Sequence, residues 1–222
     1  MPWVDSGKHL GNILENKIDG MQKDIRVKRA KYINRNNNLM QEFHFAHPVT
    51  KFTVNRIYNT NFTGSNLWDF NSEAFESLGK TWNVSVRIMF SLPRTTHRYF
   101  IEPITDQQHI QIILMKRFLK FCVQLRDSSK SVLNKVLNYC ESDTMTRTGH
   151  NLRSILLLAN KTSFSEIIQS DLDTIIYKEI PDGEEWRVHT LKELMEIRQN
   201  PEMLPNFSYK DIEDLISFVC TT

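Results

Sequence analysis

Catalysis by a polymerase or a nuclease needs carboxylates that converge on metal ions, and this sequence offers few candidates for such a cluster. Two-metal sites hold their ions about 4 Å apart, so the acids must gather closely in space. Only the C-terminal region is rich in acids, at Asp171, Asp173, Asp211, Glu213 and Asp214. Asp211 and Asp214 stand at an expected helix start, where negative charge favourably meets the helix dipole. We therefore predict no catalytic carboxylate and no metal site.

Motifs for nucleophilic or nucleotide-dependent catalysis are also missing from the sequence. It has no G-x-S-x-G elbow, no G-x-x-x-x-G-K-[ST] loop and no G-x-G-x-x-G pattern. The cysteines are Cys122, Cys140 and Cys220, and no two of them form a C-x-x-C pair, so neither zinc nor a disulfide framework has sequence support. Cys122 falls on the apolar side of a Phe-rich segment and is expected in the core. We predict no cofactor and no enzymatic activity.

Basic side chains are the remaining chemical signal, because lysine and arginine contact phosphates. Helical spacing places Lys28, Lys31 and Arg35 along one edge of a predicted helix, with Arg29 nearby. Such an edge can follow a phosphate backbone. The alternative is that these charges only solvate an exposed helix.

A second basic cluster surrounds a connector at 90–99, together with aromatic rings that could stack on unpaired bases. The alternative for its aromatic residues is a place in the core. A further candidate surface is formed by Lys116, Arg117 and Lys120. The arginines of the connector and its flank are Arg87, Arg94 and Arg98, and the aromatic residues are Trp82, His97 and Tyr99.

Charge is divided unevenly along the chain, although the whole carries a net charge of only +2. Residues 1–160 hold 22 Lys and Arg against 13 Asp and Glu, whereas residues 161–222 hold 6 against 13. A basic body favours a polyanionic partner, and an acidic C-terminal region should repel phosphates. Uneven solvation of an ordinary surface is the alternative.

Apolar residues recur at helical spacing through most of the chain, so the sequence predicts a mainly α fold with few or no strands. The first expected helices are a long one over 17–43, with Pro48 ending the short segment after it, and a short one over 53–62. Gly64 and Ser65 mark a turn. A helix over 72–90 should bury Phe75, Leu78, Trp82, Val86 and Met89.

The clearest helix is expected over 106–126, capped by Asp106 and burying Ile110, Leu114, Phe118, Phe121 and Leu125. Further helices are expected over 129–141, with Val132, Leu133, Val136, Leu137 and Cys140 inward, and over 150–160 after Gly149. Segments 174–180 and 185–189 are expected as short strands or irregular chain. Capping patterns appear at Ser163 with Glu166, Thr190 with Glu193, and Ser208 with Asp211.

Neither a signal peptide nor an apolar run long enough to span a membrane is present. The expected location is therefore intracellular, in the cytoplasm or nucleus, without secretion or membrane attachment.

Several strings resemble one family. They are HLGN at 9–12, KRAKYINRNNNLMQEF at 28–43, IYNTNFTGSNLWDF at 57–70, WNVSVRIMFSLPRTTHRYFIEP at 82–103 and, more weakly, GEEWRVHTLKELMEI at 183–197. Together they resemble the C-terminal part of the reverse transcriptase, an RNA-directed DNA polymerase, of non-LTR (LINE-type) retrotransposons. The metal-binding Asp-Asp pair of that family's palm and the motifs of its endonuclease are absent here.

This resemblance implies a thumb-like helical unit over 1–70, a helical post-thumb region over 71–160 and an acidic, partly helical region over 161–222. The thumb-like unit would ride on template–primer nucleic acid, either RNA or an RNA–DNA duplex, without catalysing. The chain would then be a fragment of a transposable element. Two alternatives are a helical protein-interaction module, which could associate with a polymerase palm, and a relic without function.

Overall fold

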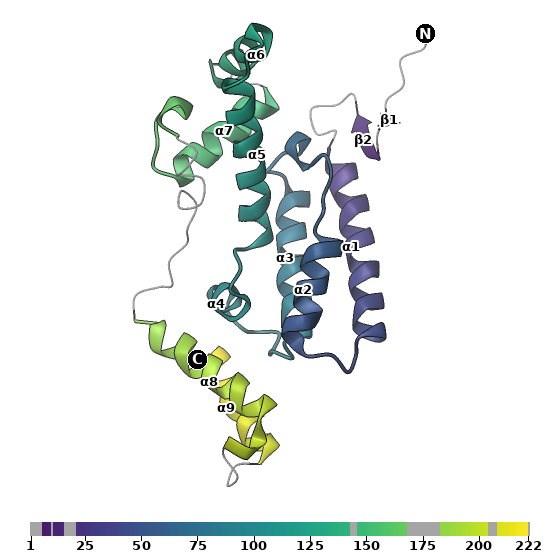
Figure 1. Ribbon diagram of the computed structural model, residues 1–222, viewed down its shortest axis with the longest axis vertical. Helices are drawn as coiled ribbons and strands as arrows, with labels where there is room; N and C mark the ends of the chain where they lie inside the picture. Colours follow the sequence, from purple (N-terminus) through teal and green to yellow (C-terminus); the bar gives the residue numbers. More distant parts are fainter. Residues whose placement is uncertain are drawn as a thin grey trace.

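Helices dominate the structure, as the hydrophobic spacing predicts. The computed structural model describes residues 6–9, 11–15, 21–142, 146–167, 183–203 and 208–221. Figure 1 shows α1, α2 and α3 side by side, with α5 leading away from them to α6 and α7, and with α8 and α9 at the opposite end. The helices are α1 Gln22–Glu42, α2 Pro48–Asn59, α3 Glu73–Met89, α4 Ile101–Thr105, α5 Ile110–Arg126, α6 Ser131–Ser142, α7 Arg147–Leu158, α8 Glu185–Gln199 and α9 Tyr209–Thr221.

Short elements complete the described chain. An antiparallel hairpin pairs β1 (Ser6–His9) with β2 (Asn12–Glu15), with Gly7 opposite Leu14. This hairpin is the only sheet in the described part of the chain, which confirms the prediction of few or no strands. The 3-10 turns are η1 Ser65–Leu67, η2 Arg98–Phe100, η3 Phe164–Glu166 and η5 Pro201–Met203.

The start of α2 corrects the reading of Pro48. This residue does not end a segment but occupies the first turn of α2, where its missing N–H leaves no bond unmade. The His47 side chain accepts a hydrogen bond from the Val49 backbone N–H and caps the helix. As a result, α2 begins five residues earlier than the expected start at residue 53.

Helix α3 agrees closely with its prediction. Ser72 caps it by accepting a hydrogen bond from the Phe75 backbone N–H, and the five residues expected inside are all buried. Gly79 has a packing role, because a Cβ at this position would lie 2.5 Å from Oε1 of Gln111 on α5. That glutamine donates from Nε2 to the Phe75 carbonyl, so Gly79 leaves space for the amide that links α5 to α3.

Helix α5 differs from its prediction at both the start and the inward face. Asp106 does not cap it, but ends α4 in the left-handed region with φ of 50°, and His109 caps α5 instead. Phe118 is fully buried, whereas Phe121 is 37% exposed. The buried row continues from Phe118 to Cys122, which confirms the expected core position of that cysteine.

Later helices agree in existence and differ in detail. On α6, Leu137 is buried, but Val132 and Val136 are exposed, so their expected inward placement is wrong. Gly149 lies inside α7, which Thr146 caps. The capping box at Ser163 and Glu166 is confirmed at η3.

Two expectations for the C-terminal segment are wrong and one is confirmed. Residues 185–189 are helical and form the start of α8. The segment 174–180 lies outside the described residues. Thr190 does not begin a helix, because its hydroxyl donates to the Trp186 carbonyl within α8. Ser208 and Asp211 exchange hydrogen bonds at the start of α9, as expected, with the Ser208 N–H donating to the carboxylate at 2.8 Å.

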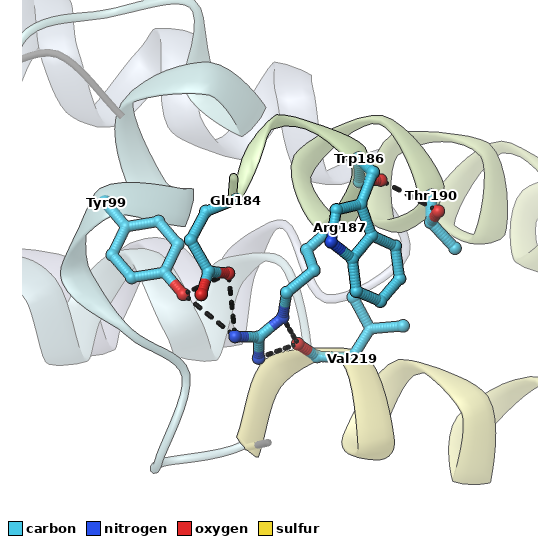
Figure 2. A network of polar contacts seen from close by, with 6 residues as sticks. All are labelled: Tyr99, Glu184, Trp186, Arg187, Thr190 and Val219. Atoms are coloured by element: carbon cyan, nitrogen blue, oxygen red, sulfur yellow. Dashed lines mark hydrogen bonds and ion pairs between the residues drawn. The ribbon is translucent and has the colours of Figure 1, made fainter. Parts of the chain in front are cut away.

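The α8–α9 pair docks onto the turn before α4 through a buried arginine (Figure 2). Arg187 donates from Nε to the Val219 carbonyl at 3.1 Å, which holds α9 against α8. Its Nη1 lies 2.8 Å from the Glu184 carboxylate and 3.2 Å from the Tyr99 hydroxyl, which itself donates to Glu184 at 3.0 Å. The guanidinium also lies 5.3 Å from the Phe100 ring centroid.

A second arginine, Arg198, completes this docking. It donates from Nη2 to the Phe90 carbonyl at 2.6 Å and from Nη1 to the Ser91 carbonyl at 3.2 Å, and it pairs with Glu213 of α9. Ser91 has φ of 50°, an uncommon conformation outside glycine, so its carbonyl is held by the turn that ends α3.

One apolar core runs from Ile25 on α1 through α3 and α5 to Ile216 on α9. The expected division at residue 70 falls between η1 and α3, which packs against α1 and α2. The three proposed regions remain a prediction. In the described chain, no helix is both long enough and apolar enough to cross a membrane.

Candidate nucleic-acid interface

Asp24 is the polar centre around which the candidate interface is built. Its carboxylate is 1% exposed in the first turn of α1, where its charge also suits the helix dipole. Oδ1 accepts from the Ile13 backbone N–H at 2.9 Å, and Oδ2 accepts from Trp68 Nε1 at 2.8 Å. One carboxylate thus joins the β-hairpin, α1 and the end of η1, which are distant in sequence.

Lys28 belongs to this same cluster. Its Nζ lies 2.9 Å from Asp24 Oδ2, and the side chain is only 14% exposed. The ammonium also donates to Asn12 Oδ1 and to the Thr63 carbonyl, and it lies 5.5 Å from the Trp68 ring centroid. Because one buried carboxylate already compensates its charge, Lys28 acts mainly as a structural residue.

Next to this cluster lies a surface hollow of about 220 Å³. We call it the α1 hollow. Lys31 and Arg35 enter it from the exposed edge of α1, one and two turns beyond Lys28. Neither has a hydrogen-bond or ion-pair partner among the described residues. The full lining is Gly11, Asn12, Lys28, Lys31, Tyr32, Arg35, Asn59, Asn61, Phe62 and Thr63, which contains no acid.

The wall of the α1 hollow is aromatic and firmly held. Tyr32 and Phe62 are buried, with their ring centroids 6.1 Å apart. Burial raises the pKa of the Tyr32 hydroxyl, which accepts a hydrogen bond from Asn55 Nδ2 at 3.2 Å. Asn55 in turn accepts from Asn59 Nδ2 at 2.9 Å. This chain of contacts fixes the amide of Asn59, a buried residue that lines the hollow.

Arg29 does not join the other three cations of its helix. It lies on the side of α1 that faces α3, where its Nε donates to Thr81 Oγ1 at 2.8 Å. Here it lines a separate groove of about 380 Å³ together with Ile33, Val84 and Ile88. The structure therefore gathers Lys28, Lys31 and Arg35 in the α1 hollow and separates Arg29 from them.

The connector arginines differ in their exposure, and their joint role in binding stays a prediction. Arg87 donates from Nε to the Thr96 carbonyl at 3.0 Å, and burial lowers the pKa of its guanidinium. Arg94 is exposed and Arg98 is half-buried at the start of η2. The α8–α9 pair contacts the connector at Phe90, Ser91 and Tyr99.

The remaining candidates on and near the connector divide between core and surface. Trp82 is buried in the core, which agrees with the alternative stated for the aromatic residues. His97 is exposed and stacks on the half-buried Tyr99 ring at 5.4 Å. On α5, Arg117 and Lys120 are exposed, and Arg117 donates to the Thr60 carbonyl at 3.3 Å.

Reactive side chains do not converge in the described part of the chain. No three His, Cys, Asp or Glu side chains lie where they could hold one metal ion, within those residues. Burial raises the pKa of the Cys122 thiol to about 12, which removes the thiolate needed for nucleophilic attack. The α1 hollow, with Lys31 and Arg35 and no acid in its lining, is instead suited to binding anions.

Sequence reasoning missed Asp24 and three asparagines of the rim, Asn12, Asn59 and Asn61. Asp24 and Lys28 stand four residues apart, an ordinary helical ion-pair spacing that could have suggested their contact. The asparagines come from two separate segments and carry no such local signal. Comparisons with protein-family models, curated proteins and solved structures give no match, so the site must be interpreted from its own geometry.

Proposed function

We propose that this protein binds nucleic acid through the α1 hollow and does not catalyse a reaction itself. The proposal rests on Lys31 and Arg35, which line a hollow that contains no acid. Neither side chain has a hydrogen-bond or ion-pair partner among the described residues. Phosphate oxygens are suitable partners, because neutralising them releases condensed counterions.

Two further features support the proposal. From Asp24 to Asp69 the chain carries seven Lys and Arg against three acids, so this segment has a net positive charge. The stretches 28–43 and 57–70, which resemble the reverse transcriptases of non-LTR retrotransposons, supply most of the lining. An RNA–DNA duplex is the substrate that this resemblance suggests first.

Salt dependence tests this proposal directly. Each phosphate contact contributes about −0.9 to the slope of log affinity against log salt. Replacing Lys31 and Arg35 with Gln should therefore flatten the slope by about two for an RNA–DNA duplex. Lys28→Gln should change the slope little and stability more, because Lys28 is paired with Asp24.

The matched control replaces two exposed lysines near and on α6, Lys130 and Lys135, with Gln. This variant loses the same charge and should keep the parent slope if α6 lies away from the nucleic acid. Equal slopes for the Lys31/Arg35 variant and the parent would reject the α1 hollow as the contact surface. Equal flattening by the control would show that only net charge matters.

The absence of catalysis is tested separately. Polymerisation needs carboxylates that hold Mg²⁺ ions, and the proposal assigns none to this chain. Purified protein should extend no primer on an RNA template with Mg²⁺. Extension above a blank without protein would overturn this part of the proposal.

A further inference from the structure

The α1 hollow has the size and chemistry to hold more than a phosphate group. Its volume of about 220 Å³ would hold roughly seven waters of liquid density, at about 30 Å³ each. This space exceeds what a phosphate group alone needs. The hollow therefore has room for a further part of one nucleotide beside the phosphate.

The rim of the hollow carries amides that a phosphate does not need. Phosphate oxygens only accept hydrogen bonds, so lysine and arginine satisfy them fully. Asn59 is a mostly buried lining residue, 8% exposed, that donates its Nδ2 to Asn55, so its Oδ1 is left as an acceptor. Asn61 is exposed and has no hydrogen-bond partner among the described residues, so it offers both a donor and an acceptor.

Mixed donors and acceptors match the edge of a nucleobase. Asparagine forms paired hydrogen bonds with base edges, and unpaired bases present those edges freely. Stacking is not the main contact here, because Tyr32 and Phe62 are buried within the wall. A base would therefore be recognised by its edge, with its phosphate near Lys31 and Arg35.

One amide of the hollow, that of Asn12, is also held in place before any ligand binds. Gly64 has φ of 78°, a left-handed conformation that favours glycine, and its missing Cβ leaves space for the Asn12 amide. Asn12 is further fixed by accepting from Lys28. A prearranged lining residue lowers the entropy lost on binding.

From these observations we propose that the α1 hollow receives one unpaired nucleotide of a nucleic-acid strand. Its phosphate contacts Lys31 and Arg35, and its base edge contacts Asn59 and Asn61. This inference rests on the proposed function and narrows it, because it makes the hollow selective for strand ends, overhangs or single strands over fully paired duplex.

The test compares a blunt RNA–DNA duplex with the same duplex carrying a short single-stranded overhang, by fluorescence anisotropy at several salt concentrations. The full chain should bind the overhang probe about tenfold more tightly, the factor expected for one well-made base contact. Asn61→Ala should remove most of this preference while leaving the salt slope unchanged.

A second variant fills the hollow without changing charge. Thr63→Phe, at an exposed lining position, should also abolish the preference for the overhang and keep binding to the blunt duplex. Thr53→Phe, at an exposed position on α2, is the matched control and should keep the preference. Circular dichroism of each variant should match that of the parent, and Asn61→Ala provides the decisive result if Thr63→Phe unfolds.

The outcomes separate this inference from the proposed function. Equal affinity for both probes, with a salt slope that depends on Lys31 and Arg35, would overturn the inference and leave the proposed function intact. An overhang preference that survives both Asn61→Ala and Thr63→Phe would also overturn it. No salt-dependent binding to either probe would overturn both.

Discussion

Asp24 should be among the most sensitive positions of the fold, because three segments depend on its carboxylate. Replacement by Ala leaves the Ile13 N–H and Trp68 Nε1 without their acceptor and leaves Lys28 without its counter-ion. Removing one partner of a buried charged pair costs about 3–5 kcal/mol. We expect Asp24→Ala to lower the free energy of unfolding by that amount, although the partial exposure of Lys28 favours the lower end.

Asp24→Asn separates charge from hydrogen bonding. The amide keeps one oxygen acceptor but loses the negative charge beside Lys28, so we expect a cost of about 1–3 kcal/mol. Urea unfolding followed by circular dichroism measures both variants, with a constant m-value indicating that only stability has changed. Glu42→Ala is the matched control, since Glu42 is an exposed acid on the same helix. It should stay within about 0.5 kcal/mol of the parent.

A double-mutant cycle tests whether the contact to Trp68 is the reason. Trp68→Phe removes the Nε1 donor and keeps most of the apolar ring. Because the two groups are in direct contact, Asp24→Asn and Trp68→Phe should be non-additive by about 1 kcal/mol or more. Additive effects, or an Asp24→Ala variant as stable as Glu42→Ala, would refute this account of the cluster.

Three further predictions concern the core, the C-terminal pair and pH. Phe118→Ala should lower the free energy of unfolding by about 3–5 kcal/mol as a large-to-small core change, whereas Phe121→Ala should lower it far less because its ring is partly exposed. Equal melting temperatures for these two variants would refute the inward face assigned to α5. Arg187→Met should increase hydrogen exchange across α8 and α9 before global unfolding, because it removes the bonds to the Val219 carbonyl; unchanged exchange would contradict this role. Hydrogen bonds from Ser208 lower the pKa of the Asp211 carboxyl. The stability that these bonds contribute is therefore present above the ordinary Asp pKa and is lost as the pH falls through the lowered pKa. Ser208→Ala should raise the Asp211 pKa in an NMR titration.

Helices with strong local signals could be predicted well from the sequence. The prediction of α3 succeeded because its apolar residues recur with a regular helical period, and the structure adds a cap at Ser72. The face of α5 was assigned wrongly at one position for a related reason. Counting large apolar residues favours Phe121, but the row that continues from Phe118 at a spacing of four contains Cys122, a smaller side chain that fills the core there.

The two errors at helix boundaries involve residue types that can stand at more than one position of a helix end. Asp106 is a good N-cap by type, yet aspartate also tolerates the left-handed conformation that ends α4. Pro48 was read as a helix breaker, although proline also suits the first helical turn. In both cases the role depends on whether a helix precedes or follows the residue, which the local sequence does not reveal.

The candidate site was only partly predictable for a tertiary reason. The edge formed by Lys28, Lys31 and Arg35 follows from helical geometry alone. The neutralisation of Lys28 and the amide rim depend on the β-hairpin and on the 59–64 segment, which tertiary packing brings to α1. A sequence-based count therefore assigns three unpaired cations to an edge on which the structure pairs one of them, Lys28, with Asp24.

The charge asymmetry of the chain becomes sharper in three dimensions. Two of the basic residues after position 160, Arg187 and Arg198, direct their guanidinium groups into the contact between α8, α9 and the rest of the protein. The outward surface of this pair is then dominated by acids, such as the exposed Glu193, Glu196 and Asp214. Figure 1 places the pair near the end of α3, away from the β-hairpin that borders the α1 hollow. Because like charges repel a phosphate backbone, this distribution supports the proposed function, in which nucleic acid approaches the hollow and not the acidic C-terminal end.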